Sequence, residues 1–377
     1  MTTAIAYLCP RRQVRVIDAN GNDRAQTGTA DAFIGWGSWA NQREKTKVHS
    51  WPTWSPDSQQ LACFRMSKED PNPRVLTWDI DNICAEELAI LNRRLPIYLQ
   101  WCHDNRQIGL VAQRRDRLFL STVCRGEVGT ENNLVDGSPM FFTWANDKLA
   151  VYVGNGDQPR LTLIDPRQPD LATDLPWIPG NFCAPLWLGD RVVYVAHHHN
   201  KQPTIVMAEP AGSFVELEEV QGLIAMSTSR DKTKIARATS KSADGSLYHD
   251  LSLLDVATGQ VHPLMEDGCL AFLWAGDALV AAMLDARQNL LRWFYLEQGE
   301  KPRHLIDLAP TRDVGFYLRF FEQYCQSHLL IDAKAEHLLL AGMKTGNEDP
   351  RIWRVPLHGG PAEDIAAGVF AVFAPHG

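Results

Sequence analysis

A short turn that recurs along the whole chain limits the possible folds more than any other feature of the sequence. Its best copy, TWSPD, ends at Asp57 and places a tryptophan three residues before an aspartate. Related turns follow at intervals of roughly 41 to 57 residues, a spacing typical of repeats built from short strands. The turns lie near Trp54, Trp101, Trp144, Trp187, Thr228, Trp274, Ile331 and Phe373. The chain is therefore expected to repeat one unit of supersecondary structure.

Each interval can be divided into four short strands. From Phe141 the apolar runs are FFTWA, KLAVYVG, RLTLIDP and DLPWI, separated by loops rich in Asn, Gly, Asp and Pro. Four short strands in a repeat of this length indicate the blades of a β-propeller. A tryptophan at the end of each first strand would fill the wedge between neighbouring sheets, and the aspartate would accept hydrogen bonds from the turn. The sequence thus predicts an all-β protein.

The two ends of the chain supply complementary parts of one blade. GVFAVFAPHG, at residues 368–377, has the pattern of a first strand with its turn, whereas TAIAYLCP, QVRVIDANG and RAQTGT near the start have the pattern of the other three strands. Pairing of Ala371 beside Ile5 would close the ring and leave no bare strand edge there. We expect residues 1–377 to form a single domain, a closed propeller of eight four-stranded blades. Seven blades result if the turn near Ile331 extends another blade.

Two intervals are long enough to hold insertions, at about residues 31–48 and about residues 309–327. Both lie between a fourth strand and the following first strand, so both should open on the same face of the propeller. Because aromatic residues recur at helical spacing in residues 314–326, we expect a short amphipathic helix there, with Phe316, Phe320 and Tyr324 on one face.

Two interpretations of these insertions stay open. In the first, the helix plugs the propeller and is buried. In the second, Trp36, Trp39, Phe316 and Phe320 form an exposed aromatic patch for a protein partner, since aromatic residues dominate interface hot spots. Replacement of these residues by serine would distinguish a buried plug from a contact patch.

The turn WSPDSQQLACF resembles the WD40-like repeat of the TolB-type propellers, which is also found in the propeller domains of prolyl oligopeptidase-type peptidases. The resemblance extends over nearly the whole chain as a repeat architecture, and only the copy at Trp54 to Asp57 keeps the full Trp-Ser-Pro-Asp. It implies a propeller fold without a particular activity. TolB works in the periplasm, whereas the start MTTAIAYLCPRRQ shows no secretion signal, so we expect a cytoplasmic protein.

Peptidase chemistry is not expected. Peptidases of this type add a catalytic α/β domain to the propeller, whereas the predicted blades use all 377 residues here, and GWGSWAN is no G-x-S-x-G nucleophile elbow. We expect no catalytic residue and no cofactor. The preferred function is a non-catalytic scaffold that binds a protein, or a small ligand, on the insertion-bearing face.

Composition narrows the class of partner. The formal net charge of −8 argues against nucleic acid, because nucleic-acid-binding domains are usually basic. No apolar run approaches the roughly 20 residues that cross a bilayer, so membrane insertion is not expected. The eight cysteines form no CxxC pair and lie in or beside apolar runs, which predicts buried free thiols.

The histidines support one enzymatic alternative. In AHHHNKQP, His197 and His199 would share one side of an extended chain. His49, Gln323, Gln326 and His328 precede or enter first strands, the place where a propeller builds a pocket. This pattern loosely resembles the oligogalacturonate lyases, cytoplasmic propellers that use histidines and a glutamine around a divalent metal. The resemblance implies a metal-dependent enzyme acting on a sugar acid, with His197, His199 and His328 as candidate ligands.

Overall fold

The computed structural model describes residues 3–18, 22–26, 47–80, 82–127, 129–145, 147–154, 159–175, 177–180, 183–197, 202–210, 212–240, 247–346 and 348–376. In these residues the chain is built from antiparallel strands, and the helices are α1 (Arg312–Arg319), α2 (Phe321–Tyr324) and one 3-10 turn (Pro169–Leu171). The all-β prediction is confirmed. The chain divides into two compact units, each described separately below.

The first unit comprises residues 1–135, 308–316 and 325–377. It holds three four-stranded sheets and the three strands β28 to β30. The strands are β1 (Ile5–Leu8), β2 (Val14–Ile17), β3 (Asp23–Gln26), β4 (Lys47–Trp54), β5 (Gln60–Ser67), β6 (Arg74–Asp79), β7 (Asn82–Ile90), β8 (Leu95–Trp101), β9 (Gln107–Arg114), β10 (Arg117–Cys124), β11 (Glu131–Gly137), β28 (His337–Met343), β29 (Arg351–Pro356), β30 (Glu363–Ala367) and β31 (Phe370–Phe373).

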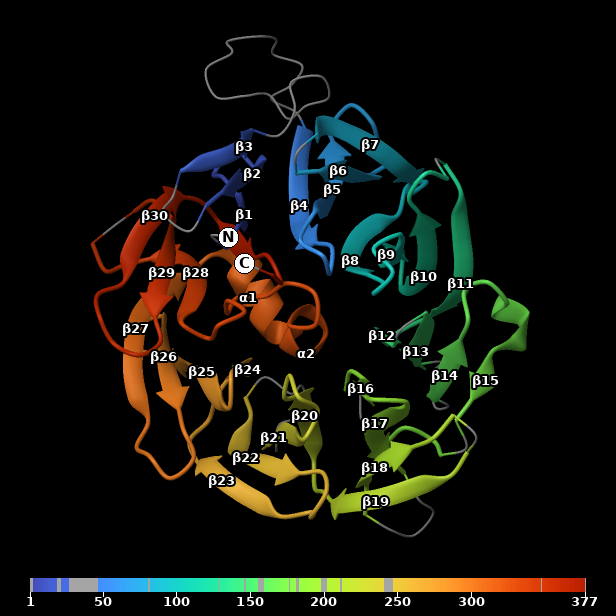
Figure 1. Ribbon diagram of the computed structural model, residues 1–377, viewed down its shortest axis with the longest axis vertical. Helices are drawn as coiled ribbons and strands as arrows, with labels where there is room; N and C mark the ends of the chain where they lie inside the picture. The colour runs from blue at the N-terminus through green and yellow to red at the C-terminus, as the bar shows by residue number, and fades with distance from the viewer. Residues whose placement is uncertain are drawn as a thin grey trace. The chain divides into compact units, whose positions relative to one another are not determined.

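One sheet of this unit joins both ends of the chain. Its order is β3-β2-β1-β31, and the markers of the two termini lie beside β1 in Figure 1. Tyr7 pairs with Ala371, and Ile5 pairs with Phe373. The shared terminal sheet is therefore confirmed, but Ala371 lies opposite Tyr7 and not opposite Ile5 as predicted. Phe370, Val372 and the residues of β1 are buried, so the strand-pairing joins two apolar segments from opposite ends of the sequence.

The second unit comprises residues 136–307 and 317–324. It holds three four-stranded sheets and the strands β24 to β27 of a seven-stranded sheet, each in the order of its strands along the chain. The strands are β12 (Met140–Ala145), β13 (Lys148–Val153), β14 (Arg160–Ile164), β15 (Thr173–Asp174), β16 (Leu186–Leu188), β17 (Arg191–Ala196), β18 (Thr204–Ala208), β19 (Phe214–Glu219), β20 (Leu223–Thr228), β21 (Lys234–Ser240), β22 (His249–Asp255), β23 (Val261–Met265), β24 (Ala271–Ala275), β25 (Ala278–Asp285), β26 (Leu290–Leu296) and β27 (Arg303–Pro310), whose last residues belong to the first unit.

The recurring turn has the chemistry that its residues predict. Asp57 Oδ1 accepts hydrogen bonds from the Ser55 hydroxyl and from the Gln59 N–H, at 2.5 and 3.0 Å. Asp104 accepts two turn amides in the next sheet. The Trp101 indole N–H donates to the Thr53 carbonyl at 3.0 Å, which ties β8 to the neighbouring β4. The tryptophan thus packs between sheets, and the aspartate holds the turn.

The turn after Ile331 is a true copy although it has neither the tryptophan nor the final aspartate. Its Ala335 has φ +56°, and Ser58 and Asn105 have φ +62° and +58° at the same place in their turns. Ile331 forms a β-bridge with Leu338 of β28. Strand β28 also pairs with the end of β27 through Met343–Ala309 and Gly342–Pro310, which gives one hydrogen-bonded order from β24 to β30. Backbone geometry therefore preserves this turn where its side chains have diverged.

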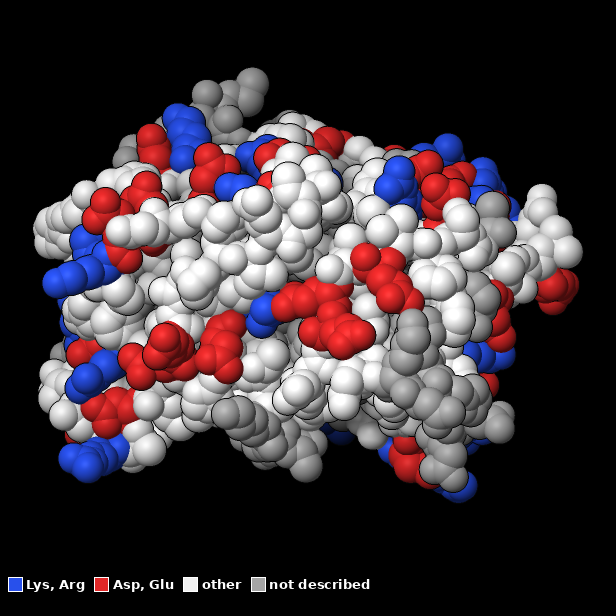
Figure 2. Space-filling model, turned by 90° about the horizontal axis from the view of Figure 1, so that it is seen from below, with Lys and Arg blue, Asp and Glu red and all other residues white. Residues whose placement is uncertain are grey.

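Charged side chains lie on the outer strands. In β19 the glutamates Glu216 and Glu219 are exposed, and Glu218 forms an ion pair with Arg237. Figure 2 shows acidic side chains gathered in a band across one face of the molecule, with few basic side chains between them. None of the described helices is long and apolar enough to span a membrane. The seven cysteines with described side chains carry free thiols, five of them buried, in agreement with the sequence prediction.

Candidate functional site

The insertion at about 309–327 forms two short helices in place of the single helix that was predicted. The N–H of Phe320 donates to the Tyr317 carbonyl, three residues back, at 3.1 Å, and this tighter turn separates α1 from α2. Because a 3-10 turn has three residues and not 3.6, the residues after it are rotated about the helix axis. The predicted face of Phe316, Phe320 and Tyr324 is therefore wrong. Tyr324 is buried, Phe320 is half-buried and Phe316 is 36% exposed.

Helix α2 lies against the first strands of sheets in the second unit. The carboxamide of Gln323 donates from Nε2 to the Phe142 carbonyl at 2.6 Å and accepts from the Phe142 N–H at Oε1 at 2.8 Å. One side chain thus satisfies both backbone groups of a residue in β12, as a neighbouring strand would. Since buried backbone groups need hydrogen-bond partners, Gln323 replaces a strand at this edge.

Glu322, the preceding residue, reaches β20. Its Oε1 accepts the Met226 N–H at 3.0 Å, and the carboxyl also bonds the backbone of Ala184, just before β16. The side chain is buried, and this burial raises the pKa of Glu322 to about 8, against the opposing effect of the two backbone hydrogen bonds. A carboxyl group in such surroundings holds its proton at neutral pH.

Phe321 completes the contacts of α2. Its ring packs edge to face on Phe272 of β24, with centroids 4.9 Å apart, and on Tyr248 at 6.1 Å. Three consecutive residues of α2 therefore contact β24, β20 and β12. All four residues of α2 are buried, as the first interpretation expected of the helix, whereas Phe316 of α1 is 36% exposed.

In the first unit, His328 occupies a closed aromatic cluster. The ring is fully buried and packs against Trp51 and Phe370, with centroids 5.6 and 6.0 Å away. Its Nε2 lies 2.9 Å from the Thr53 hydroxyl, and its Nδ1 lies 2.8 Å from the Ser327 hydroxyl.

Both nitrogens of the His328 ring lie within hydrogen-bond distance of a side-chain hydroxyl. The Thr53 hydroxyl donates to the Trp51 carbonyl at 2.9 Å, so its oxygen accepts a proton from Nε2–H. On the other side of the ring, Nδ1 lies beside the Ser327 hydroxyl, which itself donates to the Tyr98 hydroxyl at 2.8 Å. Both ring nitrogens are engaged, and neither offers a lone pair to a metal in this arrangement.

His49 also serves the fold. It is buried in β4, and its Nδ1 lies 3.1 Å from the Arg12 carbonyl. Burial lowers the pKa of His49 to about 4, with smaller contributions from Arg65 and Lys47 in the same direction. His49 is therefore neutral at physiological pH.

The remaining predicted residues are dispersed. Gln326 is half-buried in the turn after α2, and His197 is exposed after β17, where its N–H donates to the Ile178 carbonyl. His199, Trp36 and Trp39 lie outside the described residues. Phe316 packs its ring 5.6 Å from that of Trp51, on the first unit's part of the insertion.

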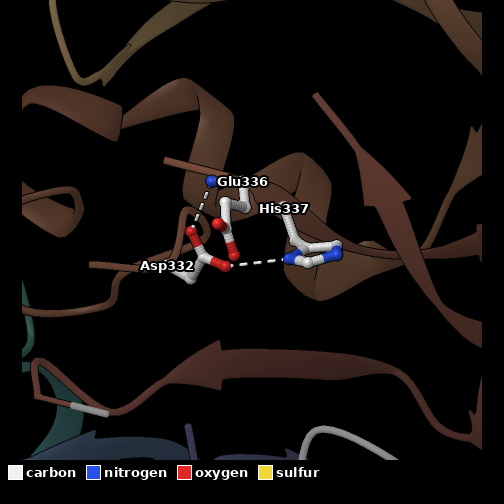
Figure 3. Close-up of side chains that lie close together, drawn as sticks. All are labelled: Asp332, Glu336 and His337. Atoms are coloured by element: carbon white, nitrogen blue, oxygen red, sulfur yellow. Dashed lines mark hydrogen bonds and ion pairs between the residues drawn. The ribbon is translucent and has the colours of Figure 1, made fainter. Parts of the chain in front are cut away.

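One group of potential metal ligands was not found from the sequence. Asp332, Glu336 and His337 bring one ligand atom each within 4.8 Å of the others (Figure 3). Asp332 Oδ1 accepts the Glu336 N–H at 2.7 Å, and Oδ2 lies 2.9 Å from His337 Nδ1. Asp332 holds its turn as Ser55 does in TWSPD, where the Ser55 hydroxyl accepts the Gln60 N–H at 3.0 Å. The turn accounts for this cluster.

The sequence suggested Gln323 as a residue for chemistry and gave no role to Glu322, and it predicted the backbone contacts of neither. The segment FYLRFFEQYCQ places a carboxylate and an amide between aromatic residues, and such a pattern signals buried polar groups. Their backbone partners in β12 and β20 are 181 and 96 residues away in sequence. The repeat pattern gives no information about these two contacts.

Comparison with known proteins identifies the fold. The sequence matches no protein-family model and no curated protein. A crystal structure of the eukaryotic initiation factor is similar at 9% identity and a TM-score of 0.55, over 100% of this chain and 98% of that one. Prolyl endopeptidases are similar at 10% identity and a TM-score of 0.56, over 88% of this chain and 50% of theirs. TolB from Acinetobacter baumannii matches at 14% identity and a TM-score of 0.42, over 78% and 77% of the two chains.

The matched proteins differ in function and share an architecture. Of these three, those with a TM-score above 0.5 are prolyl endopeptidases and an initiation factor, so the likeness speaks for the fold alone. Structures that this chain resembles include TolB and the β-propeller domain of a protease from Pyrococcus furiosus, and the repeated four-stranded sheets agree with the propeller fold that the recurring turn implied.

Proposed function

We propose that this chain is a non-catalytic β-propeller scaffold that binds a protein partner on the face carrying the insertion at about 309–327. One observation carries the proposal: the polar side chains near the first strands that could take part in catalysis form hydrogen bonds within the protein instead. Gln323 is bound at both ends to Phe142, and His328 is bound through both ring nitrogens. A lyase-like site would need such groups to project into an open pocket.

The surface of the insertion supports binding. Phe316 is 36% exposed, and its ring packs against the ring of Trp51, which is buried. An aromatic side chain supported by a rigid ring is suited to anchor a partner. The formal net charge of −8 supports a partner other than nucleic acid. We place this activity in the cytoplasm.

The proposed scaffold is a closed ring of eight blades. Three observations support it: each unit holds four sheets or sets of strands, β31 pairs with β1, and the turn after Ile331 keeps the backbone geometry of the other copies. Strand pairing between the two ends is how a ring of sheets removes its free edges.

The test compares two exposed apolar residues. Phe316→Ser removes the proposed anchor, and Leu284→Ser makes a matched change at a leucine of β25 that is 47% exposed. Untagged wild type and both variants are used to capture partners from native lysate, and their Tm values are measured. We expect Phe316→Ser to stay folded and lose the partner that wild type and Leu284→Ser retain. Retention of every partner by folded Phe316→Ser would contradict the proposed face.

A further inference from the structure

We propose that α2 is a proton-dependent staple of the second unit, whose opening is coupled to loss of the proton on Glu322. This device is separate from the proposed binding function and does not depend on it. Three consecutive side chains form the staple: Phe321 on β24, Glu322 on β20 and Gln323 on β12. Each contacts a different sheet, so α2 connects strands that have no hydrogen bonds to one another.

The residues of the staple are separated in sequence from the rest of the second unit. Residues 317–324 belong to this unit, whereas the residues immediately before and after them belong to the first unit. Helix α2 has four residues, and all of them are buried. So short a helix has little stability of its own, and its position depends on the contacts of its side chains. Breaking the Glu322 and Gln323 hydrogen bonds would release it.

The strands around Glu322 provide no charged side chain. Strand β12 is MFFTWA, β20 is LIAMST and β24 is AFLWA, and none of these residues is acidic or basic. From the segment before β16 the nearest titratable group is the Cys183 thiol, whose pKa is raised by burial and by Glu322, so it stays neutral. Tyr248, Tyr317 and Tyr324 contribute phenols, and Arg319 ends α1 on an exposed position.

The direction of the pH effect follows from these surroundings. Burial raises the pKa of Glu322 to about 8, above the ordinary value of 4.5. The closed staple therefore binds the proton more tightly than the open segment does. Its stabilisation is complete below pH 4.5 and is lost as the pH rises toward about 8. Opening should become easier over that interval and then level off.

Amide hydrogen exchange measures the staple directly. The N–H groups of Phe142 and Met226 donate to Gln323 and Glu322, so their protection factors, corrected for the intrinsic exchange rate, report its opening. In wild type we expect protection to fall by up to about tenfold per pH unit between pH 5 and pH 8. Glu322→Gln keeps an acceptor oxygen and cannot ionise, so its protection should be independent of pH.

Two further variants complete the test. Glu300→Gln, in the exposed turn before β27, is the matched control and should keep the wild-type slope. Gln323→Ala should lower the protection of Phe142 at every pH. It should retain the slope of protection against pH, because the Glu322 carboxyl group is intact in this variant. This variant and the wild-type profile decide the question if Glu322→Gln does not fold. A flat profile in wild type, or the same slope in Glu322→Gln, would overturn the proposal.

Discussion

His328 illustrates how a single residue can suggest chemistry in the sequence and serve the fold in the structure. Its position at the entry to a first strand matched that of a metal ligand. In the folded chain its two nitrogens connect Thr53 and Ser327 inside an aromatic cluster. A buried polar group must find hydrogen bonds within the protein, and a neutral imidazole can donate one and accept one. The same reasoning applies to Gln323.

His49 provides a pH test at the residue scale. Burial lowers its pKa to about 4, from an ordinary value of 6.5, so its contribution to stability is present above pH 6.5 and is lost as the pH falls toward 4. At pH 5 the loss should be about 2 kcal/mol relative to pH 7. His49→Gln keeps a donor for the Arg12 carbonyl and should lack this loss.

Urea unfolding at the two pH values measures it. His358→Gln, at an exposed histidine, serves as the control and should behave as wild type does. An equal loss of stability in His49→Gln would show that another group is responsible.

At the scale of elements, the sequence predicted the features that depend on the repeat period. The turns near Trp54 and Trp101 follow β4 and β8 as expected, because tryptophan and aspartate have local roles that are readable from spacing. The weak copy near Ile331 keeps its turn through Asp332 and Ala335, which sequence comparison alone does not reveal.

The helical insertion was predicted less well, for a physical reason. Aromatic spacing in residues 314–326 indicated one helix, but a 3-10 bond at Phe320 divides it and changes the buried face. The contacts of Glu322 and Gln323 with β20 and β12 are tertiary, and they determine where the helix ends. Local propensity does not include such contacts. Trp36 and Trp39 lie outside the described residues, so their predicted patch stays a prediction.

Strand β31 allows a direct test of an element. Deleting residues 368–377 removes Phe370, Val372 and Phe373, all buried, and leaves β1 with one hydrogen-bonded neighbour in place of two. The loss of buried apolar surface should lower the free energy of unfolding by at least about 5 kcal/mol. Deleting residues 375–377 alone leaves β31 intact and should have a small effect. Thermal unfolding of both truncations tests this, and an unchanged Tm in the longer one would rule out a structural role for the terminal sheet.

For the whole molecule, the common feature of both units is that polar side chains from the insertion and its surroundings satisfy the first strands. In the second unit Gln323 bonds β12, and in the first unit the Thr311 hydroxyl donates to the Val369 carbonyl just before β31. A ligand-binding pocket usually has a few polar groups that are free to fix the orientation of the ligand. Here these groups are hydrogen-bonded within the fold, which supports the proposed binding scaffold.

Elemental analysis of the full chain, purified without a tag and without chelators, tests this conclusion most directly, because the enzymatic alternative requires a bound divalent metal. Manganese, zinc and calcium are measured against protein concentration in wild type, in His328→Ala and in Asp332→Asn. We expect all three metals to be far below stoichiometric in wild type and unchanged in the variants. A stoichiometric metal in wild type that is lost in His328→Ala or Asp332→Asn would contradict the scaffold and favour the metal-dependent enzyme.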